Sequence, residues 1–369
     1  MSRYVLVAPD KFKGSATAAD VAAHLAAGLR AGGVLALELP VADGGDGTLD
    51  AALAAGFRRV PVCATGPTGL PVHTAVAVRG GVAVVELASV SGLVLLPDGP
   101  DPLHATSRGT GELLRAALDA GATRIVLGVG GSACTDGGTG MLAALGARFL
   151  DAHGVELPDG GGALADLHDV DLSGLDPRVA ETEIVLASDV DNPLVDAPAG
   201  YGPQKGATPA DIALLERGLA RLADLIDPAA ARLPGAGAAG GVGFAALAVL
   251  GARMRPGIEV VLDAVGFADA LAGAALVVTG EGRLDAQTLH GKAPAGVAAA
   301  ARAAGVGVVA VCGVCELDDA QLAAAGFAAA YALTQWCPDE HRCMAEPGPL
   351  LEEVGRMLAG TSLVGTALI

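Results

Sequence analysis

The chain has 369 residues, a formal net charge of −18 at pH 7, and 52% hydrophobic but only 3% aromatic residues. This acidic balance argues against nucleic acids and anionic membranes as partners, and no apolar run is long enough to span a bilayer. The first residues lead directly into a strand pattern without a secretory leader, so we expect a cytoplasmic protein. The length and the 54 glycines predict two domains rich in tight turns.

The chain opens with two strands whose ends carry acidic loops. Apolar residues predict strands at Tyr4–Ala8 and Leu35–Val41, with a helix that begins after Thr17 between them. The strands lead into Asp10–Ser15 and Ala42–Gly47, which combine charged residues with glycines. Because open α/β sheets bind ligands at the carboxyl ends of their strands, both loops are candidate binding segments.

The pattern changes to short β-rich runs over residues 59–87. The Arg79–Gly81 segment predicts a hairpin turn between two of these runs. We therefore place the entry to a second, mixed-sheet domain here. Ala105–Glu112 opens a helix whose first turn offers hydroxyls, amides and one arginine, which together suit an anion. The Gly- and Asp-rich segment 151–178 is expected to be peripheral.

The stretch Gly128–Gly140, GVGGSACTDGGTG, joins a predicted strand to a predicted helix. Six of its thirteen residues are glycines, so its backbone can approach a ligand closely and adopt positive φ angles. A glycine-rich turn from a strand into a helix directs amide groups and the helix dipole toward an anion. The stretch matches neither the P-loop nor the dinucleotide fingerprint, and an ordinary tight turn is the alternative.

Another polar strand end follows the apolar run Ile184–Ala187. The next residues bring Asp189, Asp191 and Asn192 together before Pro193 ends the element. Two carboxylates and an amide at a strand end suit Mg²⁺ binding or general-base chemistry. A turn that Asp189 merely caps is the alternative interpretation.

The last part of the chain returns to the simple alternation of strands and helices seen at its start, with strands expected at 306–311 and 328–333. We therefore predict an α/β fold of two domains. A Rossmann- or flavodoxin-like parallel sheet is built from both chain ends, residues 1–65 and 286–369. Residues 66–285 form an inserted α/β domain with a mixed sheet.

Few of the basic residues are lysines, and those few lie in turn-like segments flanked by glycine or proline. Of 23 basic residues only four are lysines: Lys11, Lys13, Lys205 and Lys292. Where arginine supplies the general positive charge, a retained lysine suggests that a compact ammonium group is needed, for instance at a phosphate or a carboxylate.

The polar loops together offer carboxylates, lysines, arginines and glycine-rich turns, without a covalent nucleophile set or a metal cage. Phosphoryl transfer needs this inventory, because the protein must position a donor, neutralise charge and orient an acceptor hydroxyl. A small-molecule kinase is therefore the leading prediction. A nicotinamide-dependent hydroxy-acid dehydrogenase and a non-catalytic sugar-acid sensor are the alternatives. Cys312 and Cys315 have the spacing of a redox motif but are expected to be small buried thiols.

Several long segments, in consistent order along the chain, resemble the bacterial type I glycerate kinases. These segments are Ala8–Ser15, Val41–Thr48, Ala105–Glu112, Gly128–Gly140, Asp189–Leu194, Tyr201–Ala207 and Thr279–Asp285. The resemblance implies ATP-dependent phosphorylation of D-glycerate to 2-phosphoglycerate with Mg²⁺, in a cleft between two α/β domains of a monomer or homodimer. A kinase for another small hydroxy acid is the alternative within this class.

Residue chemistry and this resemblance together predict three sets of site residues. The catalytic set is Asp189 as the base for the glycerate 2-hydroxyl, Asp191 as an alternative base or Mg²⁺ ligand, and Lys11. The substrate-binding set is Asp10, Lys13, Asp43, Asp46, Arg108 and Asn192, whose cations would hold the substrate carboxylate or the moving phosphoryl group. The ATP-binding set is Gly130, Gly131, Ser132, Asp136, Gly137, Gly138, Lys205 and Lys292.

Overall fold

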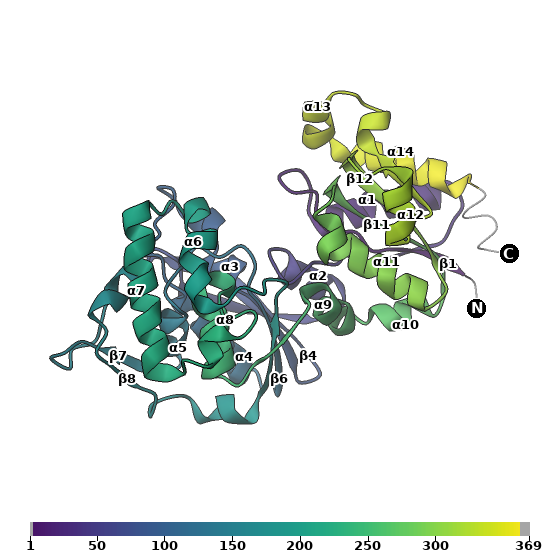
Figure 1. Cartoon of the computed structure of the whole chain (residues 1–369). Helices are drawn as coiled ribbons and strands as arrows, with labels where there is room; N and C mark the ends of the chain where they lie inside the picture. The colour runs from purple at the N-terminus through teal and green to yellow at the C-terminus, as the bar shows by residue number, and fades with distance from the viewer. Residues whose placement is uncertain (1–2, 362–369) are drawn as a thin grey trace. The chain divides into compact units, whose positions relative to one another are not determined.

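The computed structural model describes residues 3–361, without the side chain of His290, as an α/β protein (Figure 1). The described chain divides into two compact units. Unit 1 comprises residues 3–43, 50–56 and 258–361, and unit 2 comprises residues 44–49 and 57–257. Every helix within the described residues is too short or too polar to cross a membrane.

A five-stranded parallel sheet forms the centre of unit 1. Its strand order is β13-β12-β11-β1-β2, and every neighbouring pair is parallel. The strands are β1 (Tyr4–Val7), β2 (Ala36–Glu38), β11 (Ala274–Leu284), β12 (Gly307–Cys315) and β13 (Ala329–Ala332). Taken in chain order within the unit, this is the 2-1-3-4-5 order of flavodoxin-like sheets, which reverses between β1 and β11.

Helices cover both faces of this sheet (Figure 1). One face packs against α1 (Ala18–Ala31), α13 (Glu340–Ala345) and α14 (Pro347–Ala359), and the other packs against α9 (Gly257–Val265), α10 (Phe267–Leu271), α11 (Ala293–Ala303) and α12 (Asp319–Ala325). Val5 and Val7 belong to the first core and Leu6 to the second, because successive strand residues point to opposite faces. Thr17 and Asp20 cap α1 reciprocally.

Unit 2 contains a six-stranded mixed sheet in the order β10-β9-β6-β5-β4-β3. The strands are β3 (Arg58–Thr65), β4 (Pro71–Arg79), β5 (Val82–Glu86), β6 (Arg124–Gly128), β9 (Glu183–Ala187) and β10 (Arg253–Arg255). β3, β4 and β5 pair antiparallel, whereas β5, β6, β9 and β10 are parallel. The carboxyl ends of these four parallel strands therefore lie at the same edge of the sheet. β7 (Arg148–Leu150) and β8 (Asp169–Asp171) form a separate two-stranded sheet.

The helices of unit 2 build a single apolar core with the sheet (Figure 1). They are α3 (Ala88–Ser91), α4 (Arg108–Asp119), α5 (Thr139–Ala144), α6 (Ala197–Tyr201), α7 (Pro209–Ile226) and α8 (Ala238–Ala248). α2 (Thr48–Ala54) begins in unit 2 and ends in unit 1. Single 3₁₀ turns lie at Leu93–Leu95, Gly161–Asp166, Pro177–Glu181, Leu194–Asp196, Pro203–Lys205, Ala230–Arg232, Thr288–His290 and Leu333–Gln335.

The predicted fold class is confirmed, but the units do not follow the predicted boundaries. The boundary at 285 assigns β11 to the inserted domain, whereas its pairing with β1 and β12 makes it the central strand of the unit 1 sheet. The boundary at 65 assigns β3 to the first domain, whereas it pairs with β4 in unit 2. A strand's partner is decided by tertiary pairing, which the local apolar pattern does not encode.

Candidate functional site

The glycine-rich stretch that follows β6 has an exposed first part and a buried second part. Gly130 and Gly131 are exposed, Ser132 is half-buried, and residues 133–140 are buried. The φ angles of Gly131, Gly137 and Gly138 are 76°, 67° and 78°, which a side chain would disfavour. Within the stretch, Gly130–Ser132 is therefore the part that a ligand could reach, and its role as a phosphate cradle stays a prediction.

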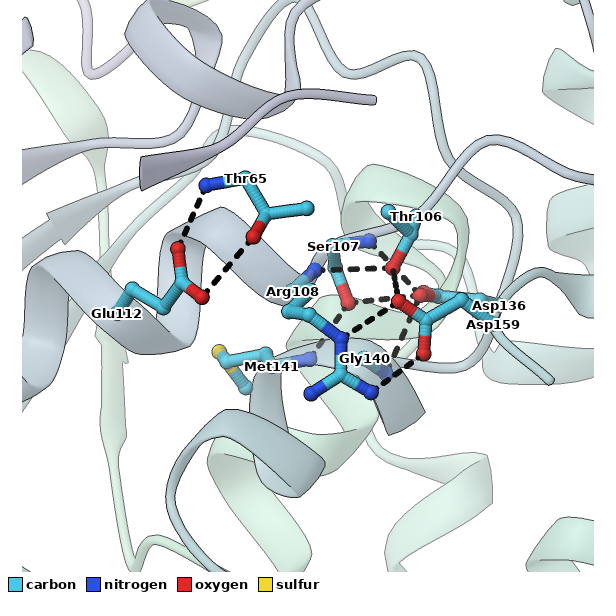
Figure 2. Close-up of polar contacts among 9 residues, drawn as sticks. All are labelled: Thr65, Thr106, Ser107, Arg108, Glu112, Asp136, Gly140, Met141 and Asp159. Atoms are coloured by element: carbon cyan, nitrogen blue, oxygen red, sulfur yellow. Dashed lines mark hydrogen bonds and ion pairs between the residues drawn. The ribbon is translucent and has the colours of Figure 1, made fainter. Parts of the chain in front are cut away.

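Asp136, within this stretch, is fully buried and accepts hydrogen bonds from several donors (Figure 2). Its Oδ2 accepts from the backbone N of Ser107 at 2.9 Å, from Ser107 Oγ at 2.8 Å and from the N of Gly140 at 3.3 Å, and its Oδ1 accepts from the N of Gly138 at 3.0 Å. Burial raises the pKa of Asp136, and the bonds from Ser107, Gly138 and Gly140 oppose this increase. Asp136, Gly137 and Gly138 are buried, and the Asp136 carboxyl group accepts from the protein's own amides. Their predicted contact with ATP stays a prediction.

Arg108, at the start of α4, forms a bidentate ion pair with Asp159 (Figure 2). Nε and Nη2 each lie 2.7 Å from an oxygen of Asp159, while the Arg108 side chain keeps 34% of its surface exposed. The pair lines a small pocket together with Thr139, Arg148 and Glu156. Asp159 orients the Arg108 guanidinium, which is predicted to bind the substrate carboxylate. Asp159 lies in the 151–178 segment, which was expected to be peripheral.

The 44–49 segment reaches the first part of the glycine stretch and the end of β9. The backbone N of Gly130 donates to the carbonyl of Gly44 at 3.3 Å. An ideal Cβ on Gly44 would lie 2.9 Å from the carbonyl oxygen of Ala187, and one on Gly128 would lie 2.6 Å from that of Gly44. These positions need glycine because the backbones are in contact. Asp46, predicted to bind substrate, is exposed on the same 44–49 segment.

The polar residues after β9 lie at the same edge of the unit 2 sheet. Asp189 is exposed, and its Oδ1 accepts from the backbone N of Gly257 at 2.9 Å. Asp191 is also exposed, and the Oδ1 of Asn192 accepts from the hydroxyl of Tyr201 at 2.9 Å. Burial, and then the charge of Asp191, raises the pKa of Tyr201. Asp189 and Asp191 therefore have the accessibility that a base or a cation ligand requires, while Asn192 is engaged within the protein.

Charged residues of unit 1 gather where its strand order reverses. Asp10 follows β1 and is 7% exposed, and its Oδ1 lies 3.9 Å from Lys11 Nζ. Burial raises the pKa of Asp10 to about 7, opposed by Lys11 and reinforced by Asp43 and Glu281. Carboxyl ends at such a reversal are where open α/β sheets bind ligands. The predicted Lys13 lies near this group and is exposed.

Glu281, near the end of β11, belongs to the same group although the sequence did not single it out. It is 8% exposed, its Oε1 accepts from Thr288 Oγ1 at 2.5 Å, and its Oε2 lies 3.8 Å from Lys292 Nζ. Burial raises its pKa, and Thr288 and Lys292 oppose that shift. The available signal was the Gly-Glu-Gly sequence after an apolar run, which becomes informative only once β11 is known to neighbour β1.

The predicted site residues therefore form two sets, one within each unit. Unit 1 brings together Asp10, Lys11, Asp43 and Lys292, and adds Glu281. Unit 2 gathers Gly130, Gly131 and Ser132 with the 44–49 segment, and buries Lys205 beneath them. Among residues 3–361, no three His, Cys, Asp or Glu side chains are arranged to hold a metal ion by themselves.

Both units, the flavodoxin-like sheet with charged strand ends and the mixed α/β unit with a glycine-rich loop, have features typical of α/β proteins that bind small ligands at the ends of their strands. The model of the glycerate kinase family matches residues 5–362. The chain belongs to this family of kinases, as its sequence motifs predicted.

Three similar proteins illustrate this membership. The chain is 45% identical to a Bacillus subtilis protein named glycerate kinase, over 85% of this chain and 86% of that protein. It is 46% identical to an Escherichia coli K12 protein named glycerate 2-kinase, over 81% of this chain and 82% of that one. A crystal structure of a Salmonella typhimurium LT2 protein, provisionally named glycerate kinase 2, is similar with a TM-score of 0.85 and 41% identity, over 99% of this chain and 100% of that one.

Proposed function

We propose that the protein transfers the γ-phosphoryl group of ATP to the 2-hydroxyl of D-glycerate and releases 2-phosphoglycerate. The observation that carries this proposal is the 46% identity, over 81% of the chain, to a protein named glycerate 2-kinase.

The glycine-rich stretch is the proposed binding site for the nucleotide phosphates in unit 2. Gly130 and Gly131 are exposed after the carboxyl end of β6, and the N of Gly130 donates to the carbonyl of Gly44. Backbone amides in a glycine-rich turn stabilise phosphate oxygens without the desolvation penalty of a buried cation. In this proposal the exposed Gly130–Ser132 segment holds the ATP phosphates.

Magnesium fits the side chains that are present, although residues 3–361 build no cage of three or more His, Cys, Asp or Glu ligands. ATP supplies the phosphoryl group, and Mg²⁺ neutralises charge on its phosphates. Mg²⁺ commonly keeps several waters and uses one or two carboxylates together with substrate phosphates. The exposed carboxylates of Asp189 and Asp191 suit such a partial set of ligands, with Asp191 as the proposed ligand.

Asp189 is the proposed general base. The amide of Gly257 donates to Oδ1 of Asp189 and orients this exposed carboxylate, which would accept the proton of the glycerate 2-hydroxyl as the oxygen attacks phosphorus. Arg108, oriented by Asp159, would hold the glycerate carboxylate, and Lys11 with Lys292 would neutralise the transferred phosphoryl group.

The proposal is tested with the purified full-length protein and a panel of short hydroxy acids. ADP release, followed by a coupled assay with ATP and Mg²⁺, should be greatest with D-glycerate and lower with L-glycerate, glycolate and lactate. Proton-coupled phosphorus NMR then identifies the product. A phosphate on C2 couples to one proton and gives a doublet, whereas a phosphate on C3 couples to two and gives a triplet. A triplet, or a clear preference for another acid, would contradict the proposal.

A further inference from the structure

Lys205 is one of the few lysines in the chain, and it lies under the glycine-rich stretch instead of facing solvent. It is 2% exposed. Its Nζ donates to Ser132 Oγ at 3.0 Å and to the carbonyl oxygen of Cys134 at 2.5 Å. Both acceptors belong to the Gly128–Gly140 stretch, and they lie on either side of Ala133. The ammonium group therefore joins the exposed part of the stretch to its buried part.

The turn that carries Lys205 is itself closely held. The backbone N of Lys205 donates to the carbonyl of Gly202 at 2.9 Å, and so does the N of Ala207, also at 2.9 Å. Gly206 has a φ of 83°, and an ideal Cβ there would lie 2.8 Å from Cβ of Pro100. A lysine that extends from so restricted a turn has little freedom to follow a ligand.

The charges around Lys205 also favour a role inside the protein. Burial lowers its pKa, and the titratable groups that oppose this shift are Cys134 and Asp136 of the same stretch. Asp136 fixes the amides of Gly138 and Gly140, while Lys205 fixes Ser132 and Cys134. The buried amino group of Lys205 and the buried carboxyl group of Asp136 thus hold consecutive parts of one loop.

We propose that Lys205 is a positioning residue for nucleotide binding and not a phosphate ligand. By holding the Ser132 hydroxyl and the Cys134 carbonyl, it keeps the exposed Gly130–Ser132 segment in the conformation that binds the ATP phosphates. This inference rests on the proposed use of ATP. A compact ammonium group fits the buried space between two acceptors, which a planar guanidinium does not.

The decisive comparison uses Lys205→Met, Ser132→Ala and the double variant. Lys205→Met removes the donors but keeps an unbranched side chain of similar length, and Ser132→Ala removes one of the two acceptors. We expect Lys205→Met to raise the Michaelis constant for ATP roughly 10-fold, the equivalent of one lost hydrogen bond to a charged group. The turnover number at saturating ATP should change less than about threefold, because no group at the reacting atoms is removed.

The double-mutant cycle separates positioning from direct contact. If Lys205 acts through Ser132, Ser132→Ala should give part of the effect, and the double variant should be no worse than Lys205→Met. Fully additive effects, or an unchanged Michaelis constant for ATP in Lys205→Met, would overturn the proposal. If Lys205→Met does not fold, Ser132→Ala alone still tests it, because an unchanged constant there would contradict the link between the two side chains.

A matched control excludes a general loss of stability as the cause. Thr208→Ala removes the reciprocal cap of α7, three residues beyond Lys205, and touches no residue of the stretch. It should lower the thermal midpoint without changing the Michaelis constant for ATP. Calorimetric titration of ATP into each variant provides a readout without turnover. Should the wild type phosphorylate no acid of the panel, the proposed reaction fails, while these titrations still decide the role of Lys205.

Discussion

The two units place their candidate binding groups at the same kind of position, the carboxyl ends of parallel strands, but they present different chemistry there. Unit 1 gathers the side chains of Asp10, Lys11 and Lys292 beside Glu281, and their charges act on one another. Unit 2 presents the backbone of Gly130 and Gly131.

The difference lies in what each unit does with its charged groups. In unit 2, Asp136 and Lys205 are buried and bind only to the glycine-rich stretch and the start of α4. In unit 1, burial raises the pKa of Asp10 to about 7, so this carboxyl group changes its charge near neutral pH. In unit 2, the buried groups of Asp136 and Lys205 therefore stabilise the loop. In unit 1, the charge of Asp10 can change with pH and with its neighbours. Each prediction below tests one side of this contrast.

The largest effect is expected at Asp189, the exposed carboxylate that departs from the pattern of unit 2. Asp189→Asn keeps an oxygen for the amide of Gly257 but removes the base, so turnover should fall by at least ~10²-fold. Steady-state kinetics and circular dichroism measure activity and folding together. Asp224→Asn, at an exposed position on α7, is the matched control and should leave turnover unchanged. Near-normal turnover in Asp189→Asn would reject the assignment.

The next effect is on stability and concerns the buried anion of unit 2. Asp136→Ala leaves the amides of Ser107, Gly138 and Gly140 without their acceptor, and each buried unsatisfied donor costs about 1–3 kcal/mol. The free energy of unfolding should fall by about 3 kcal/mol or more, measured by chemical denaturation. Asp151→Ala also removes backbone acceptor bonds, from His153 and Val155, but at an exposed turn, and should cost less than about 1 kcal/mol. Equal losses at both sites would contradict the structural role of Asp136.

A moderate effect is expected for Arg108, whose side chain is partly exposed in unit 2. Arg108→Met should raise the Michaelis constant for glycerate by roughly 10–100-fold, the equivalent of a lost charge-assisted hydrogen bond. Arg148→Met is the matched control, because Arg148 lines the same pocket and is paired with Glu156 at 2.7 Å; it should leave the constant unchanged. If the two variants behave alike, the carboxylate of the substrate binds elsewhere.

The last prediction concerns the free energy of unfolding, which should depend on pH through Asp10. Its folded pKa of about 7 exceeds the ordinary 3.8, so between these values the folded state binds a proton that the unfolded state has released. Wild-type stability should therefore fall as the pH rises through this range, and Asp10→Asn should escape that loss. The free energy of unfolding of the variant should exceed that of the wild type by up to about 4 kcal/mol above pH 7, and by nearly nothing at about pH 4.

Thermal unfolding at a series of pH values measures this difference. Asp50→Asn, at an exposed position of unit 1, should shift stability equally at every pH. A difference between wild type and Asp10→Asn that stays constant with pH would show that Asp10 titrates normally, and the contrast between the units would lose its electrostatic basis.

The sequence by itself determined the elements, the fold class and the family. Local rules were sufficient for these, because the Thr17–Asp20 and Thr208–Asp211 caps and the hairpin at Arg79–Gly81 depend on residues close together in the chain. The recognised motifs likewise lie in continuous segments.

Only the tertiary structure decided which of the predicted site residues are buried and which groups lie beside them. Asp136 and Lys205 look like site residues in sequence because they are charged and lie in glycine-rich turns, but packing buries both of them. Conversely, Glu281 joins Asp10 only because β11 pairs with β1 across more than 250 residues of chain, and Asp159 becomes the partner of Arg108 through a loop 51 residues away. Burial and long-range pairing depend on the whole packed chain, so no local pattern of residues encodes them.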